Sequence, residues 1–255
     1  YIVALGSTAE TATLSLKERD EVLRFIINRT DGRVPIVAGM GSNNTADLVE
    51  QLHSFNLDGV VAILSVVPYY NKPSQEGIYR HFMAVADASP VPVIIYNVPG
   101  RTGLNMTAAT TLRLAHATPK IVAIKEACGN IEQMQAILDG RPEDFLVLSG
   151  DDGITVELVK RGGDGVISVA ANAFPERFCG CVHNAMKGNI ALAESEIAEL
   201  TPAIDLLFKE GNPTGVKAMT AAMGITRSEV RLPLVEGTEN LAADIKSAIA
   251  RYELK

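Results

Sequence analysis

Lys125 stands at the end of a short apolar segment in the stretch "IVAIKEACGN", residues 121–130. A short run of β-branched and apolar residues is typical of a buried strand. A charged amine at the end of such a strand costs free energy unless it is paired, solvated or neutral. Desolvation favours the neutral amine, which can attack a carbonyl group and form a Schiff base. The alternative is a lysine whose stem runs along the surface and whose amine reaches water.

Other polar side chains follow neighbouring apolar segments. Tyr96 could carry protons to and from the carbinolamine that lysine attack produces, or it could be a core tyrosine with a solvated hydroxyl. Ser7 and Thr8 could extend a proton relay, or they could form a turn or helix cap. Arg101, in a loop with Gly100 and Gly103, offers a planar fork for a carboxylate, or it could make a surface ion pair.

Composition narrows the class of protein. The chain has 255 residues, a formal net charge of −7 and 47% hydrophobic residues, which predicts one large globular body. The negative charge gives no general attraction to nucleic acid or anionic membranes, and we expect neither as a partner. No apolar run approaches the ~18 residues of a membrane span. Three cysteines without Cys-x-x-Cys spacing and four scattered histidines indicate a cytoplasmic protein without a bound metal.

Apolar segments alternate with longer amphipathic ones. Each apolar segment lacks the in/out alternation of a half-exposed strand, which indicates parallel strands covered on both faces. We expect seven such strands: 1–7, 34–39, 59–65, 91–97, 121–125, 145–150 and 165–170. Helices are expected at 15–30, 43–56, 74–89 and 107–118, and in the tail at 175–187, 190–209, 213–224 and 238–252. Ser15 and Glu18 have the spacing of a capping box at the start of the first helix.

Strand and helix repeat about every 25 to 30 residues, which indicates βα units with right-handed crossovers. We predict an α/β fold, a (β/α)8 TIM barrel with a C-terminal helical extension. Because only seven strands are found, we expect that the first βα unit is missing from this chain; a seven-stranded open sheet is the alternative. The expected division is residues 1–173 for the barrel and 174–255 for the last barrel helix and the C-terminal helices.

Several motifs together resemble the dihydrodipicolinate synthase family, within the pyruvate-dependent, lysine Schiff-base (class I) aldolase superfamily. "GSTAE" resembles the family's Gly-Thr-Thr-Gly-Glu motif, and "PYYNKPSQEGIYRHF", "YNVPGRTG", "IKEACGN", "LSGDD", "GVISVAAN" and "RLPL" are similar to family motifs in the same order. The resemblance extends from residue 1 to about residue 235. It implies a lyase that condenses pyruvate with L-aspartate 4-semialdehyde in diaminopimelate and lysine biosynthesis, without a metal or organic cofactor.

The resemblance also implies roles for individual residues. Lys125 would form the imine with pyruvate, while Tyr96, Ser7 and Tyr70 would form the proton relay, Tyr70 reaching the site of a neighbouring subunit. The substrate-binding residues would be Thr8 for the pyruvate carboxylate, Arg101 for the carboxylate of the second substrate, and Ile167 and Gly150 as lining of the pocket. The usual family assembly implies a homotetramer of two tight dimers, or a dimer.

Two positions depart from the family pattern. Ser7 stands where a threonine is usual; its hydroxyl keeps a relay possible, and serine also occurs in the N-acetylneuraminate lyase branch. Ala9 replaces a usual glycine, so we expect its φ to be negative or mildly strained. Arg101 favours the synthase over sugar-acid lyases, which lack this arginine. Another pyruvate aldolase, such as a neuraminate or keto-deoxy-sugar-acid lyase, and a catalytically inactive binding homologue remain alternatives.

Lysine-sensitive family members bind lysine at the dimer interface. The positions corresponding to that site are Thr11, Ala12, Leu16, Arg19, Asn43, Asp47 and Tyr69. Leu16 and Arg19 replace residues that are histidines in some lysine-sensitive bacterial enzymes, and Arg19 adds a positive charge where a cationic ligand would bind. We therefore expect weak or absent inhibition by lysine.

Overall fold

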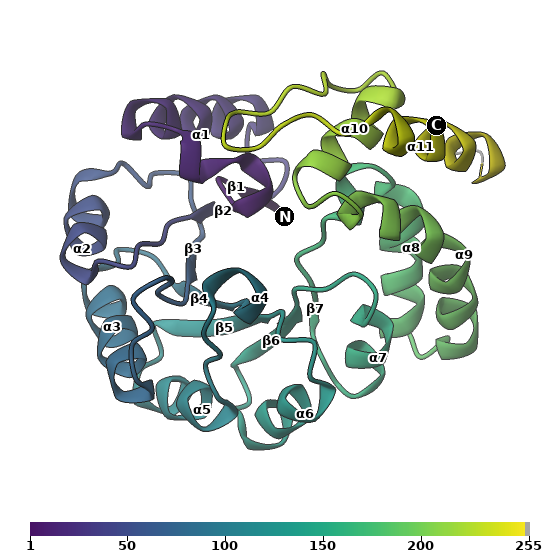
Figure 1. Cartoon of the computed structure of the whole chain (residues 1–255). Coiled ribbons are helices and arrows are strands. Elements are labelled where there is room, and N and C mark those ends of the chain that lie inside the picture. Colours follow the sequence, from purple (N-terminus) through teal and green to yellow (C-terminus); the bar gives the residue numbers. More distant parts are fainter. Residues whose placement is uncertain (253–255) are drawn as a thin grey trace. The chain divides into compact units, whose positions relative to one another are not determined.

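The computed structural model describes residues 1–252, which form two compact units (Figure 1). The first unit comprises residues 1–6, 14–150 and 162–167. The second comprises residues 7–13, 151–161 and the described residues from 168 onward. The seven predicted strands all lie in the first unit.

The strands of the first unit form one parallel sheet in the order of the sequence, β1 to β7. Their bounds are β1 Ile2–Ala4, β2 Ile36–Gly39, β3 Ala62–Val66, β4 Val93–Asn97, β5 Ile121–Glu126, β6 Leu146–Ser149 and β7 Gly165–Val166. The hydroxyl of Tyr1, directly before β1, donates at 2.9 Å to the carbonyl of Val166 in β7, which links the first and last strands of the sheet. The predicted α/β class, with successive parallel strands joined by helices, is confirmed.

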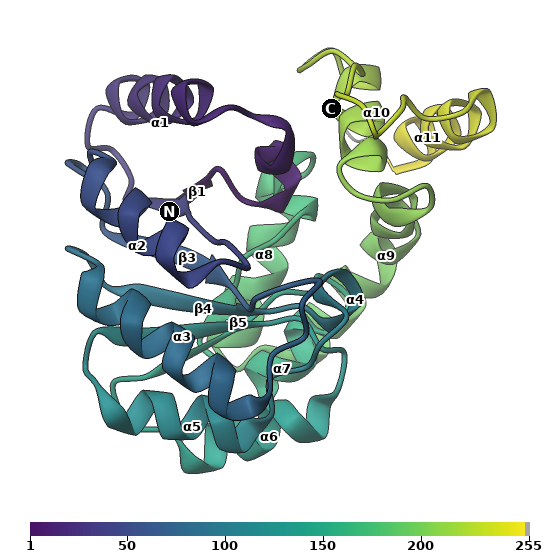
Figure 2. The ribbon, with the colours of Figure 1, turned by 60° about the vertical axis from the view of Figure 1, so that its left-hand side comes forward.

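Helices of the first unit follow the strands, and Figure 2 shows α3, α5 and α6 on the outer side of β3, β4 and β5. Their bounds are α1 Leu16–Thr30, α2 Thr45–Ser54, α3 Gln75–Ala88, α4 Pro99–Thr102, α5 Ala108–Ala117 and α6 Ile131–Gly140. The Ser15 side chain accepts from the Glu18 N–H, and the Glu18 carboxylate accepts from the Ser15 N–H, so the predicted capping box is confirmed.

The structure corrects several expected boundaries. The first strand ends at Ala4, and residues 7–9 form a 3-10 helix. The seventh strand covers only Gly165 and Val166 instead of 165–170. Arg101 lies in the short helix α4 and not in a loop. Helix α6 was not expected, although Asn130 as N-cap and the buried Met134 and Ile137 give it a helical pattern.

The second unit is mainly helical. It contains the 3-10 helices η1 Ser7–Ala9, η2 Thr11–Thr13 and η3 Ala170–Asn172, and the helices α7 Thr155–Lys160, α8 Pro175–Met186, α9 Ile190–Phe208, α10 Thr214–Ala222 and α11 Glu239–Tyr252. Buried apolar side chains of α7, α8 and α9 form one core cluster, which includes Val156, Cys181 and Ala193. The predicted C-terminal helical extension is confirmed. Within residues 1–252, no helix is both long and apolar enough to cross a bilayer.

A buried histidine joins two helices of the first unit. His81 of α3 is 4% exposed, and its Nδ1 lies 2.9 Å from Oγ1 of Thr45 in α2. Its Nε2 is buried, with no hydrogen-bond partner among the described residues. Burial lowers the pKa of His81 from 6.5 to about 4.

We expect this histidine to destabilise the fold as the pH falls from 6.5 towards 4. In that window the unfolded chain binds a proton that the folded chain excludes, and the loss reaches up to about 3 kcal/mol. The measurement is the free energy of unfolding by urea between pH 7.5 and 4, for the wild type and for His81→Gln. The glutamine variant should lose less stability over this range; two parallel pH curves would contradict the prediction.

Candidate active site

Lys125 and Tyr96 are neighbours across two adjacent strands. They are paired in the register of β4 and β5, close to the carboxyl ends of both strands. Lys125 is 8% exposed and Tyr96 is 7% exposed. The Lys125 Nζ lies over the Tyr96 ring, 4.2 Å from its centroid. The structure therefore places a largely desolvated amine against an aromatic face, which shields the amine from bulk water.

The inner faces of the strands surround this pair with apolar side chains. Tyr96 belongs to a buried cluster with Ala123 of β5, Leu148 of β6 and Ile167, which follows β7. Ala123 and Lys125 share one face of β5 because side chains alternate along a strand. The N–H of Ile167 donates to the carbonyl of Ser149 at 2.9 Å, which fixes Ile167 at the carboxyl end of β6.

Gly150 closes the space beside Lys125. Its N–H donates to the carbonyl of Glu126 at 2.7 Å, which holds the end of β6 against the end of β5. A Cβ on Gly150 would lie 3.1 Å from Lys125 Cε and 2.7 Å from the Cβ of Ala127. Only glycine allows this approach without displacement, so of the predicted site residues the structure brings Lys125, Tyr96, Gly150 and Ile167 into one region.

The next register pair, Asn97 and Glu126, points to the opposite face of the same two strands. Both side chains are fully buried. The Asn97 Nδ2 donates to both carboxylate oxygens of Glu126, at 2.9 and 3.1 Å. Burial raises the pKa of Glu126, while hydrogen bonds from Asn97, Gln133 and Cys128 act in the opposite direction. Sequence reasoning missed this pair; the only signal was a carboxylate directly after the strand-end lysine.

Arg101 is exposed and lies in α4, a helix of one turn whose short length follows from its flanking residues. Pro99 occupies its first turn, and Gly103 ends it with a φ of +71°. The buried hydroxyl of Thr102 donates to the carbonyls of Val98 and Leu104. The turn is therefore anchored through the buried Thr102, while the neighbouring Arg101 is exposed.

Tyr70 lies between β3 and α3 and is 87% exposed. Its φ is +71° and that of Lys72 is +46°, a region that non-glycine residues rarely occupy. The Nδ2 of Asn71 donates to the carbonyl of Asn43 at 2.9 Å, which ties this segment to the residues before α2. A tyrosine held in a strained backbone conformation with its side chain in solvent is suited to contact another molecule.

Ser7 and Thr8 lie in η1 of the second unit. The hydroxyl of Thr8 accepts a hydrogen bond from Nδ2 of Asn212 at 2.9 Å. Ala9 avoids positive φ as expected, and the following Glu10 takes it instead, with φ +55°. Asn212 was missed because 204 residues separate it from Thr8, and no local pattern connects them.

Glu10 fixes the segment that carries Ser7 and Thr8. Its carboxylate accepts from Lys217 Nζ and from the N–H of Arg231, each at 2.8 Å. Although burial alone would raise the pKa of Glu10, these contacts lower it. Glu10 is therefore held as a carboxylate that joins η1 to the later helices of the second unit.

The residues expected to form a lysine site are distributed over both units. Thr11 and Ala12 lie in η2 of the second unit. Leu16 and Asp47 are exposed on α1 and α2, and Tyr69 is exposed before α3. The Nε of Arg19 donates to the carbonyl of Leu14 at 3.1 Å. Asn43 contributes its carbonyl to Asn71, so this oxygen already has a partner.

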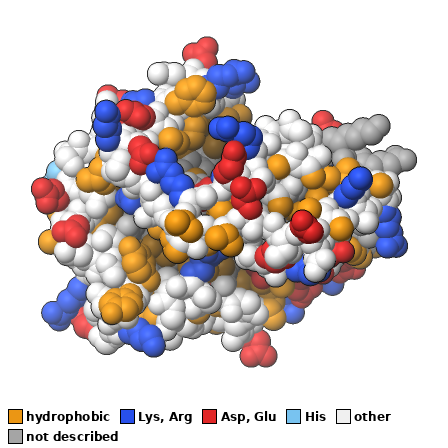
Figure 3. Space-filling view, turned by 45° about the horizontal axis from the view of Figure 1, so that its top comes forward, with side chains coloured by type: hydrophobic (Ala, Val, Ile, Leu, Met, Phe, Trp, Pro, Cys, Tyr) orange, Lys and Arg blue, Asp and Glu red, His pale blue; other side chains and the backbone are white. Residues whose placement is uncertain are grey.

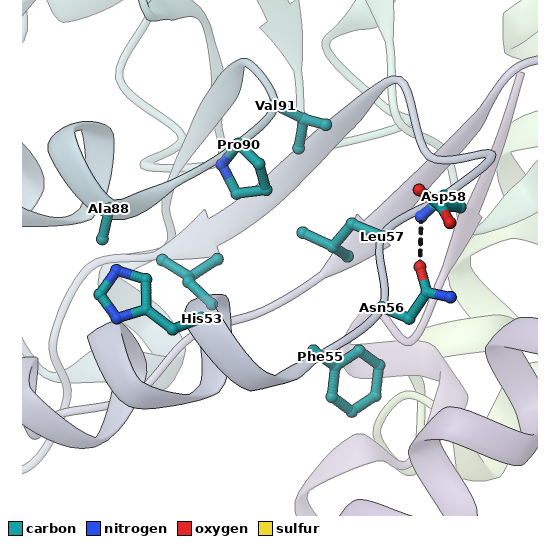
Figure 4. Close-up of a pocket in the computed structure, with 9 residues that line it drawn as sticks. His53, Phe55, Asn56, Leu57, Asp58, Ala88, Pro90 and Val91 are labelled. Atoms are coloured by element: carbon teal, nitrogen blue, oxygen red, sulfur yellow. Dashed lines mark hydrogen bonds between the residues drawn. The ribbon is translucent and has the colours of Figure 1, made fainter.

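A shallow pocket of about 500 Å³ lies at the other end of the strands (Figure 4). It is lined by residues at the ends of α2 and α3 and before β3 and β4, with His53, Leu57 and Val91 among them. It contains none of the predicted site residues.

Figure 3 shows basic and acidic side chains interspersed on one face of the molecule.

Comparison with known proteins adds independent information. The family model described as Dihydrodipicolinate synthetase family matches residues 1–251. A 4-hydroxy-tetrahydrodipicolinate synthase of Phocaeicola vulgatus is 52% identical over 235 residues, covering 92% of this chain and 79% of the relative.

Solved structures give the same result. The chloride-inhibited dihydrodipicolinate synthase of Acinetobacter baumannii, complexed with pyruvate, superposes with a TM-score of 0.95 at 38% identity, covering 100% of this chain and 87% of the other. A monomeric dihydrodipicolinate synthase variant superposes with a TM-score of 0.96 at 34% identity, covering 99% and 85%. The parallel sheet, the helical extension and these matches over nearly the whole chain agree: the chain belongs to the dihydrodipicolinate synthetase family.

Proposed function

We propose that this chain is a 4-hydroxy-tetrahydrodipicolinate synthase, a lyase that condenses pyruvate with L-aspartate 4-semialdehyde in the diaminopimelate route to lysine. The observation that carries the proposal is the buried Lys125 amine over the Tyr96 ring, 4.2 Å from its centroid, at the carboxyl ends of parallel strands. In barrel enzymes of this kind the active site lies at that end of the strands. Membership of the family supports the choice of reaction.

The reaction begins when the neutral Lys125 amine attacks the ketone carbon of pyruvate. A nitrogen–carbon bond forms, the carbinolamine loses water, and a protonated imine results. Loss of a methyl proton gives an enamine, because the imine nitrogen accepts the electron pair; this electron sink makes a metal or organic cofactor unnecessary. The enamine carbon attacks the aldehyde carbon of the second substrate. The amino group of that substrate then attacks the imine carbon of the same adduct, which closes the ring, breaks the bond to Lys125 by transimination and releases the cyclic product.

Proton transfers in these steps are assigned to Tyr96, Ser7 and Tyr70. Tyr96 is the member that packs against the amine. Thr8 would bind the pyruvate carboxylate, and the hydrogen bond from Asn212 would orient its hydroxyl for this contact. Arg101 would bind the carboxylate of L-aspartate 4-semialdehyde in the bidentate manner that a guanidinium allows. Gly150 and Ile167 would line the pocket.

Tyr70 would act in the site of a neighbouring subunit, which its exposure and strained backbone support. The proposed assembly is therefore a homo-oligomer in the cytoplasm, a dimer or a tetramer of two dimers. One similar structure is that of a monomeric variant, so similarity alone does not fix the oligomeric state. Sedimentation velocity measures the oligomeric state of this chain directly. The division into residues 1–173 and 174–255 stays a prediction.

The proposal is tested by borohydride reduction in the presence of pyruvate, followed by peptide mass mapping. A pyruvate-derived mass should be found on Lys125 alone. Turnover is then measured with pyruvate and L-aspartate 4-semialdehyde, and separately with N-acetylneuraminate and keto-deoxy-sugar acids. Trapping without turnover of the semialdehyde would move the assignment to another pyruvate aldolase. Absence of both trapping and turnover would leave a binding homologue.

Lysine is expected to inhibit this enzyme weakly or not at all. Arg19 adds a positive charge at the corresponding site, and its Nε already donates to the Leu14 carbonyl. Leu16 supplies an aliphatic side chain where some sensitive enzymes have a histidine. Initial rates at saturating substrates with increasing lysine give the inhibition constant, and a micromolar value would refute the expectation.

A further inference from the structure

The carboxylate of Glu126 is surrounded by N–H donors. The Asn97 Nδ2 contacts both oxygens, the Gln133 Nε2 donates to Oε2 at 3.1 Å, and the N–H of Cys128 donates to Oε1 at 2.9 Å. Since each of these partners is a donor, the network satisfies a carboxylate and not an amide or a carboxylic acid. A buried charge with several donors makes strong hydrogen bonds and is costly to disturb.

The same donors reach the segment that follows α4. The Met106 N–H donates to Asn97 Oδ1 at 3.0 Å, and the Met106 carbonyl accepts from Gln133 Nε2 at 3.0 Å. Asn105 accepts from Asn97 Nδ2 at 2.8 Å and donates to the Gln133 side chain at 2.8 Å. Both polar backbone groups of Met106 thus bind side chains that also bind Glu126.

Arg101 lies on the turn between these anchored points. Asn97 precedes α4 at the end of β4, and Asn105 and Met106 follow it. The turn is therefore held at both ends by the network on the outer face of β4 and β5. The inner face of the same two strands carries Tyr96 and Lys125.

We propose that Glu126 is a positioning residue for the second substrate: through Asn97 and Gln133 its buried carboxylate fixes the turn that carries Arg101. This inference rests on the proposed function, in which Arg101 binds the carboxylate of L-aspartate 4-semialdehyde. Glu126 itself touches no substrate. Loss of the Glu126 charge should change the position of Arg101 more than that of Lys125. Lys125 is held by the register of β4 and β5 and by its contact with the Tyr96 ring.

The substitution Glu126→Gln keeps the size of the side chain and tests the charge. The introduced N–H₂ group replaces either Oε1, which accepts from Asn97 and the Cys128 N–H, or Oε2, which accepts from Asn97 and Gln133. In both orientations it faces the N–H₂ group of Asn97. Asn97 or Gln133 then has to turn away, and its hydrogen bond to Met106 or Asn105 is lost. The turn that carries Arg101 loosens, although the strand remains in place.

Steady-state kinetics with each substrate varied in turn give the measurement. For Glu126→Gln we expect KM for L-aspartate 4-semialdehyde to rise by about 10-fold to 100-fold, since small misplacements of a binding group have effects of this size. KM for pyruvate should stay within about 2-fold, and borohydride trapping on Lys125 should persist. The matched control is Glu132→Gln, the same change on the exposed start of α6, which should leave both KM values unchanged.

Two further variants keep the test decisive. Asn105→Ala removes a half-buried outer member of the network and should show the same KM split to a smaller degree, even where Glu126→Gln fails to fold. The double variant Asn97→Asp/Glu126→Gln places the carboxylate at position 97 and the amide at position 126. It should restore part of the affinity for L-aspartate 4-semialdehyde. Unchanged KM for the semialdehyde in Asn105→Ala, or an equal rise for both substrates in Glu126→Gln, would overturn the inference. An inactive, untrappable wild type would instead refute the proposed function.

Discussion

Replacing Lys125 with arginine or methionine is expected to lower kcat/KM for the condensation by at least about 10³-fold, since the proposed nucleophile is lost. Arginine keeps the positive charge but stays protonated and cannot add to a ketone. Methionine keeps most of the volume and apolar contact and removes the amine. In both variants borohydride should trap no pyruvate on the protein. The rate of condensation with L-aspartate 4-semialdehyde should not exceed the rate without enzyme.

The control for this experiment is Lys120→Arg, at the opposite end of the same strand. Lys120 is exposed, and its Nζ donates to the carbonyl of Asp87 at 3.1 Å, a contact that arginine can keep. This variant should retain wild-type kinetics. Circular dichroism and thermal unfolding check that the Lys125 variants are folded. A folded Lys125→Arg enzyme that turns over at the wild-type rate would refute the Schiff-base mechanism.

Gly150→Ala is expected to reduce both activity and stability. The added methyl group would lie 2.7 Å from the Cβ of Ala127 and 3.2 Å from the Glu126 carbonyl, which cannot yield without moving the end of β5. Overpacking of this kind costs about 1–3 kcal/mol. The methyl group would also lie 3.1 Å from Lys125 Cε and displace the amine, which should lower kcat by about 10-fold to 100-fold.

The matched control is Gly180→Ala in the interior of α8, where a Cβ meets nothing within 4 Å. It should leave kcat unchanged and stabilise the helix by about 0.5–1 kcal/mol. Thermal unfolding and saturation kinetics on both variants separate the two effects. Wild-type kcat in Gly150→Ala would show that Lys125 has more room than the structure gives it.

Much of the fold follows from local patterns. The apolar runs that lack alternation locate the strands, because a parallel strand covered on both faces has no polar side. Lys125 and Tyr96 could be predicted to lie close together, since the ends of consecutive parallel strands meet at one edge of the sheet. Their stacked arrangement could not, because it depends on the register of β4 and β5 and on the side-chain conformations.

Other features depend on contacts that a single sequence does not show. The link between Asn212 and Thr8 spans most of the chain. The buried pair Asn97 and Glu126 contradicts the expectation that charged residues lie at the surface, and only the surrounding donors explain it. The strand expected to reach residue 7 ends at Ala4, and Ser7 lies in a 3-10 helix. The apolar pattern has no sharp end in this segment, so it does not reveal that the backbone already turns at Leu5, with φ +59°.

The alternation of side chains along β4 and β5 has a consequence for engineering. Positions 96 and 125 face the proposed reaction site, and positions 97 and 126 lie on the opposite face, so the proposed chemistry and the scaffold occupy different residues of the same two strands. A mutant library aimed at new aldehyde acceptors can vary the α4 turn and inward positions other than 96 and 125, while positions 97 and 126 stay fixed. Libraries that randomise the continuous segments 96–97 and 125–126 would yield mostly misfolded variants.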